Sequence, residues 1–194
     1  MPLRFLSAGR PRQISVSGDQ YVPLSLSLIP LEALGQLVYL NIEDRDKGYG
    51  GGYFEVKVEP LSGEIAAFIV TRLPAVSFIE FPVDIEKLRS FESGELSDSG
   101  AGIRVDRAQW DLNADLVPRL AVVRESVLLV AYCSDEMIYF SFGDVVPSKK
   151  IEFGQFGFIL DEHDFLAGFS IAAGSHGEDD VFSGILRLLR ESAA

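Results

Sequence analysis

The fold is decided by two stretches that lie about 100 residues apart, Ile65-Ala66-Ala67-Phe68-Ile69-Val70 and Leu166-Ala167-Gly168-Phe169-Ser170-Ile171. Each places small residues beside a phenylalanine, and small residues set how closely an opposing layer can approach. Each also ends a similar series of strand, loop, strand, tight turn and strand, at 38–42, 54–58 and 65–70 and again at 138–142, 156–160 and 166–171. The series predicts two similar antiparallel β units and a possible duplication. The alternative is that any two hairpins of a phenylalanine-rich chain align this well.

Working outward, alternation of apolar and polar residues predicts further strands at 14–17, 24–28, 76–81, 120–123 and 127–132, and a continuous strand at 153–160. Short helices are expected at 30–37 and at 85–91, the latter capped by Asp84, and a helix closes the chain. The expected fold class is therefore α+β, mostly antiparallel sheet with a few short helices and a C-terminal helix. A Ser-, Gly- and acid-rich loop suggests two units, 1–92 and 103–194, packed as one globular domain.

Charge and cysteine content limit the function classes. The 194 residues carry a net charge of −12, and no Lys or Arg occurs between Ile151 and Leu186. Nucleic-acid binding needs clustered cations, so neither nucleic acid nor an anionic membrane is expected as partner. No stretch reaches the roughly 18 apolar residues of a membrane span. Cys133 is the single cysteine and lies in an apolar run, which predicts a buried, unreactive thiol and a cytoplasmic protein.

The second unit resembles a known family. Asp135-Glu136-Met137-Ile138-Tyr139-Phe140, followed by Gly157-Phe158-Ile159-Leu160-Asp161 and by the stretch from Leu166 to Ile171, is similar to small uncharacterised bacterial β-hairpin domains. The resemblance covers about 37 residues. Phe165 stands where that family has its turn glycine, and Ser170 where it has an acid. The resemblance implies a hairpin fold and no activity.

Complete catalytic, metal and nucleotide motifs are missing from the sequence, and we expect no cofactor. His163 and His176 stand among acids and could join an oxygen-rich metal site, but both lie in turn sequences. Asp44, Asp46 and Glu55 fall on ligand positions of a calcium loop, yet Tyr49 occupies the position that demands glycine. A flexible polar loop at 43–52 is the favoured interpretation.

Because the sequence holds no complete catalytic motif, we expect a non-catalytic protein that binds and regulates another protein, such as an immunity protein that neutralises a basic toxin. Acidic inhibitors associate faster with basic partners through long-range attraction. The expected contact residues are acids in two loops and before the last helix: Asp161, Glu162, Asp164, Glu178, Asp179, Asp180, Glu43, Asp44 and Asp46. One alternative is an enzyme or ligand-binding protein with a pocket between the units, lined by Tyr53, Trp110, Tyr132 and Tyr139. Another is a structural or assembly protein.

Overall fold

Two large β-sheets make up most of the described structure. The computed structural model describes residues 3–30, 37–77, 81–91, 102–109, 121–174 and 181–192. The first sheet has the order β10-β4-β5-β6-β3-β2, and the second has the order β7-β11-β12-β15-β14-β13-β8. The strands of the first sheet are β2 (Ser15–Ser17), β3 (Leu24–Ser27), β4 (Val38–Asp44), β5 (Gly48–Val58), β6 (Ile65–Arg72) and β10 (Ala121–Val127). Those of the second are β7 (Ala75–Ser77), β8 (Arg89–Ser90), β11 (Leu129–Cys133), β12 (Met137–Phe142), β13 (Lys149–Phe153), β14 (Phe156–Leu160) and β15 (Leu166–Ala172).

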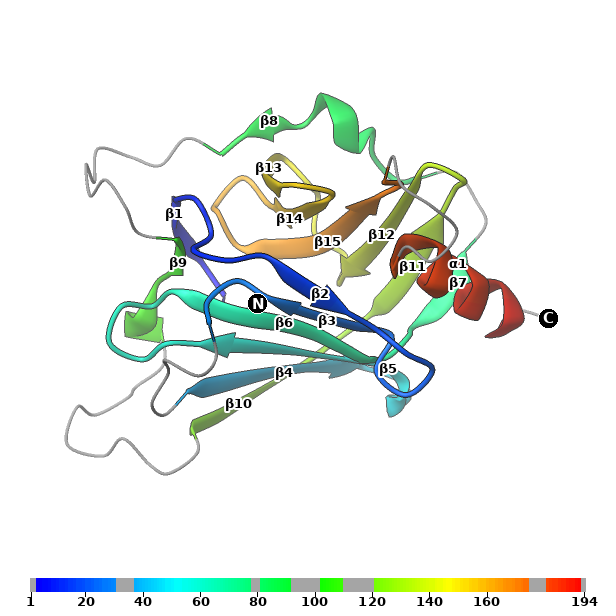
Figure 1. The fold of residues 1–194 in the computed structure, drawn as a ribbon, viewed down its shortest axis with the longest axis horizontal. Helices are drawn as coiled ribbons and strands as arrows, with labels where there is room; N and C mark the ends of the chain where they lie inside the picture. Colours follow the sequence, from blue (N-terminus) through cyan, green and yellow to red (C-terminus); the bar gives the residue numbers. More distant parts are fainter. Residues whose placement is uncertain are drawn as a thin grey trace.

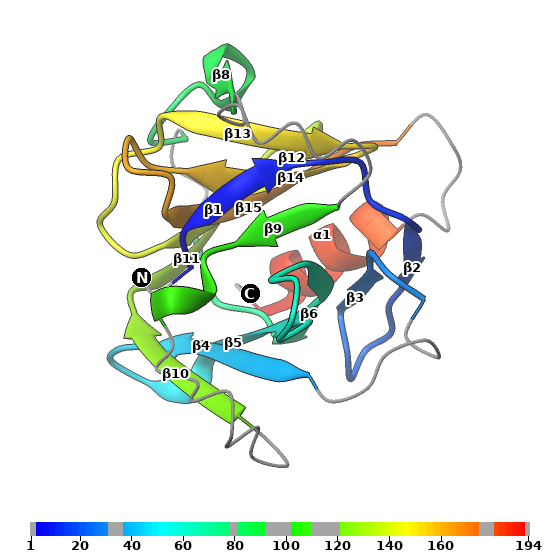
Figure 2. The same ribbon diagram turned by 90° about the vertical axis from the view of Figure 1, so that its left-hand side faces the viewer.

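The two sheets pack face to face as a sandwich, with the first sheet below the second in the view of Figure 1. A separate pair of strands, β1 (Phe5–Ala8) and β9 (Ile103–Val105), spans one open side between the sheets, as Figure 2 shows. The amphipathic helix α1 (Val181–Ser192) lies at the opposite side and buries Phe182, Ile185, Leu186 and Leu189. Two 3₁₀ turns complete the described elements, η2 (Ile85–Lys87) and η3 (Arg107–Gln109). No helix in the described ranges is long and apolar enough to cross a membrane.

Five strands of each sheet share one topology. In the first sheet β2, β3, β6, β5 and β4 follow one another, and in the second β11, β12, β15, β14 and β13 do. All neighbours within these two sets are antiparallel. The hairpin β5–β6 therefore corresponds to β14–β15, as the sequence suggests. The strand at 138–142, however, corresponds to β3 rather than to the strand at 38–42, because β12 pairs with the second hairpin strand whereas β4 pairs with the first.

The correspondence extends to register. Val56 pairs with Phe68 in the first hairpin, and Phe158 pairs with Phe169 in the second. The register of both hairpins shifts two residues further along, where Val58 pairs with Ile65 and Leu160 pairs with Leu166. A β-bulge bends and twists a strand locally. The same bend therefore occurs at the same place in the two hairpins.

Aromatic side chains fill the space between the sheets. Phe68 and Phe169, which hold equivalent places, stack on each other with ring centroids 4.2 Å apart. Phe54 meets Phe140 and Phe142 across the sandwich at centroid separations of 5.2 and 5.0 Å. These five rings are fully buried. Ala66, Ala67, Ala167 and Gly168 stand next to the stacked pair in sequence and add little bulk to the two central strands.

Strands are exchanged between the two halves of the chain. β7 and β8 come from the N-terminal half, yet β7 pairs with β11 and β8 pairs with β13. β10 comes from the C-terminal half and pairs with β4 of the first sheet. The chain then crosses to the second sheet at Leu128, between β10 and β11. The predicted units 1–92 and 103–194 thus contribute strands to each other's sheets.

Several sequence expectations differ from the structure. The helix expected at 85–91 is a single 3₁₀ turn followed by β8, because Leu88 is extended and Phe91 donates its amide to the carbonyl of Lys150. Asp84 makes no side-chain cap there. The polar loop expected at 43–52 is a short turn, and its glycines belong to β5. The strand expected at 153–160 is two strands that turn at Gly154, where φ is +66°. The helix expected at 30–37 falls mostly outside the described residues.

Candidate functional site

The acids predicted to contact a partner do not form one surface. Glu43 and Asp44 end β4 and Asp46 lies in the turn to β5, whereas Asp161, Glu162 and Asp164 belong to the turn between β14 and β15. The second turn lies beside β1, since the amide of Phe5 donates to the carbonyl of Asp164. β1 in turn pairs with β9, which contacts the turn between β5 and β6, and the β4–β5 turn is at the opposite side of the molecule (Figure 1). Glu178, Asp179 and Asp180 lie outside the described residues.

Asp44 has a structural role. Its side chain is buried, and its carboxylate accepts hydrogen bonds from the amides of Asp46 and Lys47 at 3.0 and 2.8 Å. The other carboxylate oxygen accepts from the amide of Leu129 at 3.2 Å, where the chain enters the second sheet. Asp44 therefore joins a turn of the first sheet to the start of β11. Backbone amides thus occupy both carboxylate oxygens of Asp44, where a partner or a calcium ion would have to bind.

The β14–β15 turn is also held by its acids. Asp161 accepts hydrogen bonds from the amides of His163 and Phe165, both at 2.8 Å. Asp164 is the residue in the left-handed conformation, with φ of +70°, and its carboxylate pairs with Lys149. The resemblance placed the glycine-favouring position at Phe165. The structure has it at Asp164 instead. Glu162 is exposed, and the ring of His163 lies 3.3 Å from its carboxylate.

A segment of the N-terminal half covers the outer face of the second sheet. This segment, which we call the cover segment, comprises residues 81–91. Ile85 packs there with Tyr139 and Ile159 in a second hydrophobic cluster, outside the sandwich. The ring of Tyr139 lies over Gly168, where a Cβ atom would come within 2.4 Å of the ring. Burial raises the pKa of Tyr139 to about 12, so its hydroxyl stays neutral and donates to the carbonyl of Ala167.

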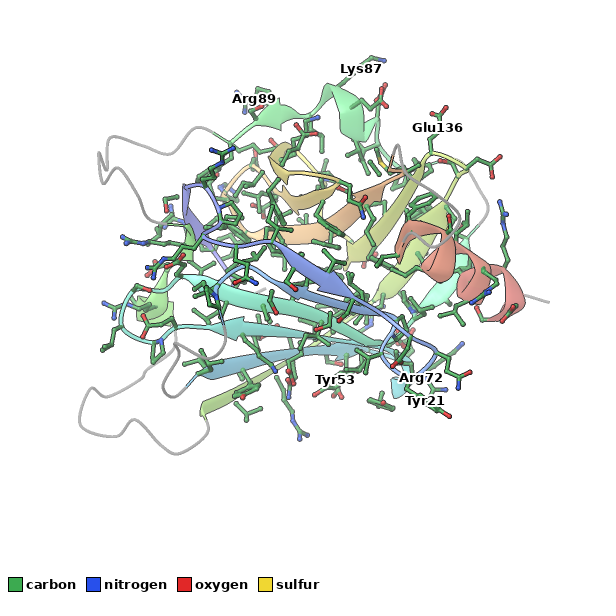
Figure 3. The ribbon with its side chains drawn as sticks, in the orientation of Figure 1. Tyr21, Tyr53, Arg72, Lys87, Arg89 and Glu136 are labelled. Atoms are coloured by element: carbon green, nitrogen blue, oxygen red, sulfur yellow. The ribbon has the colours of Figure 1, made fainter. Side chains whose placement is uncertain are left out.

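Two depressions flank the cover segment. The first, which we call the acidic pocket, has a volume of about 240 Å³ and is lined by Phe81, Val83, Asp84, Ile85, Glu86, Ser134, Glu136 and Met137. The second, the charged groove, has a volume of about 620 Å³ and is lined by Lys87, Leu88, Arg89, Val145, Val146, Pro147, Ser148, Asp161, Glu162 and His163. Figure 3 shows Glu136, Lys87 and Arg89 along the same upper edge of the molecule. We call the two depressions together the cover surface.

The lining of the cover surface combines apolar side chains with charged ones, and its excess of acids comes from the acidic pocket. Its lining holds five carboxylates against two cations, an excess of three negative charges. Lys87 donates to Asp84 at 2.6 Å, and this hydrogen bond lowers the pKa of Asp84 and raises that of Lys87. Glu86 and Glu136 have no ion pair with any described residue, and neither does Arg89. Such free charges beside apolar side chains can bind a ligand of opposite charge.

Sequence reasoning missed most of the cover surface. Of the acids predicted to bind a partner, Asp161 and Glu162 line it, and the other described ones do not. The signal that could have revealed it is the alternation Phe81-Pro82-Val83-Asp84-Ile85, which suits an extended segment with one apolar side.

A second cluster lies on the first sheet. The rings of Tyr49 and Tyr53 are 5.1 Å apart, and the guanidinium of Arg72 stands 5.6 Å from the centroid of Tyr49. Figure 3 shows Tyr53 and Arg72 near the lower edge, where no described element covers the sheet. Tyrosine and arginine are common in protein interfaces. This cluster offers stacking surfaces and one cation.

The aromatic residues that suggested a pocket between the units lie elsewhere. Tyr132 and Tyr139 stack on each other at 6.0 Å on the outer face of the second sheet, and Tyr53 lies on the outer face of the first. Trp110 is outside the described residues. The buried phenylalanines occupy the space between the sheets. The structure therefore contradicts the expected placement of these tyrosines between the two units.

The sequence also raised the questions of a metal site and of a reactive cysteine. No group of three His, Cys, Asp or Glu residues in the described ranges could hold a metal ion, and His176 falls outside them. Cys133 is half-buried, and burial raises the pKa of its thiol to about 11. A thiol with so high a pKa is a poor nucleophile at neutral pH.

Comparison with known proteins gave no match to any protein-family model and no match among curated proteins. The similarity of residues 135–171 to small bacterial hairpin domains therefore stays a prediction.

Proposed function

We propose that the protein is a non-catalytic binding protein that engages a basic protein partner through the cover surface. The observation that carries the proposal is the lining of this surface, where an apolar base meets five carboxylates and only two cations. Interfaces gain affinity from apolar side chains in a desolvated centre and gain specificity from complementary charge around it. Both components are present on the cover surface.

The charge of the whole chain supports the same kind of partner. At a net charge of −12 the protein attracts cationic proteins over distances beyond contact. Neutralisation of a basic toxin by an immunity protein is one function of this type, and it is the instance that we propose to test first.

The test begins with co-purification of a partner from native host cells at low salt. The affinity of the purified partner is then measured for the double variant Glu136→Lys, Glu162→Lys, which changes one acid in each depression. The matched control is Glu43→Lys, Asp46→Lys, which makes the same change in net charge at the other side of the molecule. We expect the first variant to weaken binding by roughly tenfold or more and the control by much less.

Two results would overturn the proposal. One is equal weakening by both double variants, because only total charge would then matter. The other is recovery of no protein partner by the unchanged chain. Binding that persists at high salt would argue that charge is secondary, since exposed pairs are screened beyond about 10 Å at 0.1 M salt.

We also propose that the two sheets arose by duplication of a five-stranded unit. The shared strand order, the equivalent bulges and the stacked pair Phe68 and Phe169 support this origin. Residues at a two-fold axis contact their own equivalents, as these two rings do. Sequence profiles of the two units, built from relatives, should align with Phe68 on Phe169, and a different best alignment would argue against duplication.

A further inference from the structure

The acidic pocket combines an apolar base with a charged rim. Ile85 is only 5% exposed, and it forms the base with the half-buried side chains of Phe81, Val83 and Met137. The base continues into the cluster around Tyr139 and Ile159, so it is backed by a fully buried layer. A ligand that enters the pocket therefore meets a preformed apolar surface.

Two rim carboxylates are available to a ligand. Asp84 is occupied by Lys87, whereas Glu86 and Glu136 make no ion pair with a described residue, although the charge of Glu86 also acts on Lys87. The first comes from the cover segment and the second from the turn between β11 and β12, so they approach the pocket from different elements. The β11–β12 turn is fixed because Ser134 accepts hydrogen bonds from the amides of Glu136 and Met137 at 3.2 and 3.0 Å.

We propose that the acidic pocket binds one arginine side chain of a protein partner. This inference rests on the proposed function and names the contact that the pocket makes. The methylene stem of arginine suits the apolar base, and its guanidinium carries five donors in a plane, which can serve carboxylates from two directions. Phe81 also lines the pocket, and an aromatic ring attracts a guanidinium that is placed over its face. At about 240 Å³ the pocket is smaller than the roughly 300–1,000 Å³ of drug-sized ligand sites, which favours a single side chain.

The test needs no partner. The full chain, labelled with ¹⁵N, is titrated with N-acetyl-arginine amide and with N-acetyl-citrulline amide, which has nearly the same shape without the charge. We expect the arginine probe to shift the amide signals of Ser134, Glu136 and Met137, with the citrulline probe at least roughly fivefold weaker. N-acetyl-lysine amide should also bind more weakly, because a point charge cannot meet both carboxylates.

Variants localise the effect. Glu86→Gln combined with Glu136→Gln should weaken the arginine probe roughly tenfold, since it removes both charges and keeps the side-chain size. The matched control is Asp135→Asn combined with Glu191→Gln, which makes the same change in net charge; neither residue lines the pocket, and Asp135 pairs with Arg190 at 2.7 Å. The control should leave the affinity unchanged. Dispersed amide spectra of both variants would show that the fold is intact.

The inference is overturned if citrulline or lysine probes bind as well as arginine, or if the pocket variant and the control behave alike. Failure of the proposed function would give a different experimental result. In that case the arginine probe would still bind the pocket, while Glu86→Gln and Glu136→Gln would leave the affinity of the purified partner unchanged.

Discussion

The stacked pair at the centre of the sandwich allows a direct test of how the two sheets pack. Phe68 and Phe169 are fully buried and contact each other with ring centroids 4.2 Å apart and planes inclined by 24°. Leucine at either position keeps an apolar side chain but removes the ring contact. We expect each single variant, Phe68→Leu or Phe169→Leu, to lower the free energy of unfolding by about 1–2 kcal/mol.

The double variant separates this contact from the others that each ring makes. Aromatic pairs contribute about 0.5–1.5 kcal/mol beyond the area that they bury. The double variant should therefore cost less than the sum of the singles by about that amount. The assay is urea unfolding followed by circular dichroism, with the four proteins compared under one set of conditions.

A control pair is Phe68→Leu with Ile85→Val, because Ile85 belongs to the separate hydrophobic cluster on the outer face of the second sheet. Their effects should add within about 0.3–0.5 kcal/mol. If the effects of Phe68→Leu and Phe169→Leu also add to within that margin, the two rings are not stacked, and the equivalence of the two sheets across this contact is wrong.

Three further predictions concern other residues. Gly168→Ala places a Cβ atom 2.4 Å from the ring of Tyr139 and should destabilise the fold by about 1–3 kcal/mol, as measured by thermal unfolding. Gly184→Ala faces open space in α1 and should have the opposite sign, raising stability by about 0.5–1 kcal/mol in the same assay. The raised pKa of Cys133 means that the folded state holds its thiol proton more tightly than the unfolded state, so this contribution is complete below pH 9 and lost as pH rises toward about 11. Cys133→Ser should therefore show a shallower loss of stability over this range, and an unchanged slope would contradict the burial argument.

The strands were the part of the fold that sequence could predict. Alternation marks β2 and β3, because apolar and polar side chains on a strand point to opposite faces. β6 is instead a continuous apolar run, and five of its eight residues are buried. The C-terminal helix could also be predicted, since its four buried residues recur at helical spacing. The prediction of mostly antiparallel sheet with a closing helix is confirmed in outline.

Pairing between strands that are far apart in the sequence could not be predicted from local patterns. β8 has only two residues, and its place beside β13 depends on a partner about 60 residues away. The local signal at 85–91 favoured a helix, but the hydrogen bond from Phe91 to Lys150 and the packing of Ile85 on Tyr139 stabilise an extended chain instead. Tertiary contacts outweigh weak local preference in such short segments.

The candidate site shows the same limit. Acids are visible in a sequence, so the exposed Glu162 could be found, but nothing local distinguishes it from Asp44 or Asp161, whose carboxylates accept hydrogen bonds from backbone amides. The pocket near Glu86 and Glu136 exists only because the cover segment folds over the β11–β12 hairpin. A site assembled from two separate segments leaves no contiguous motif.

The exchange of strands between the sheets has a consequence during synthesis. β4 remains an open edge until β10 is made about 80 residues later, and β7 waits about 55 residues for β11. At roughly 5–20 residues per second, the nascent first sheet stays incomplete for several seconds or longer. During that time its unpaired edge can associate with neighbouring chains, so the yield of native protein should depend on translation speed and on chaperones that shield the emerging strand.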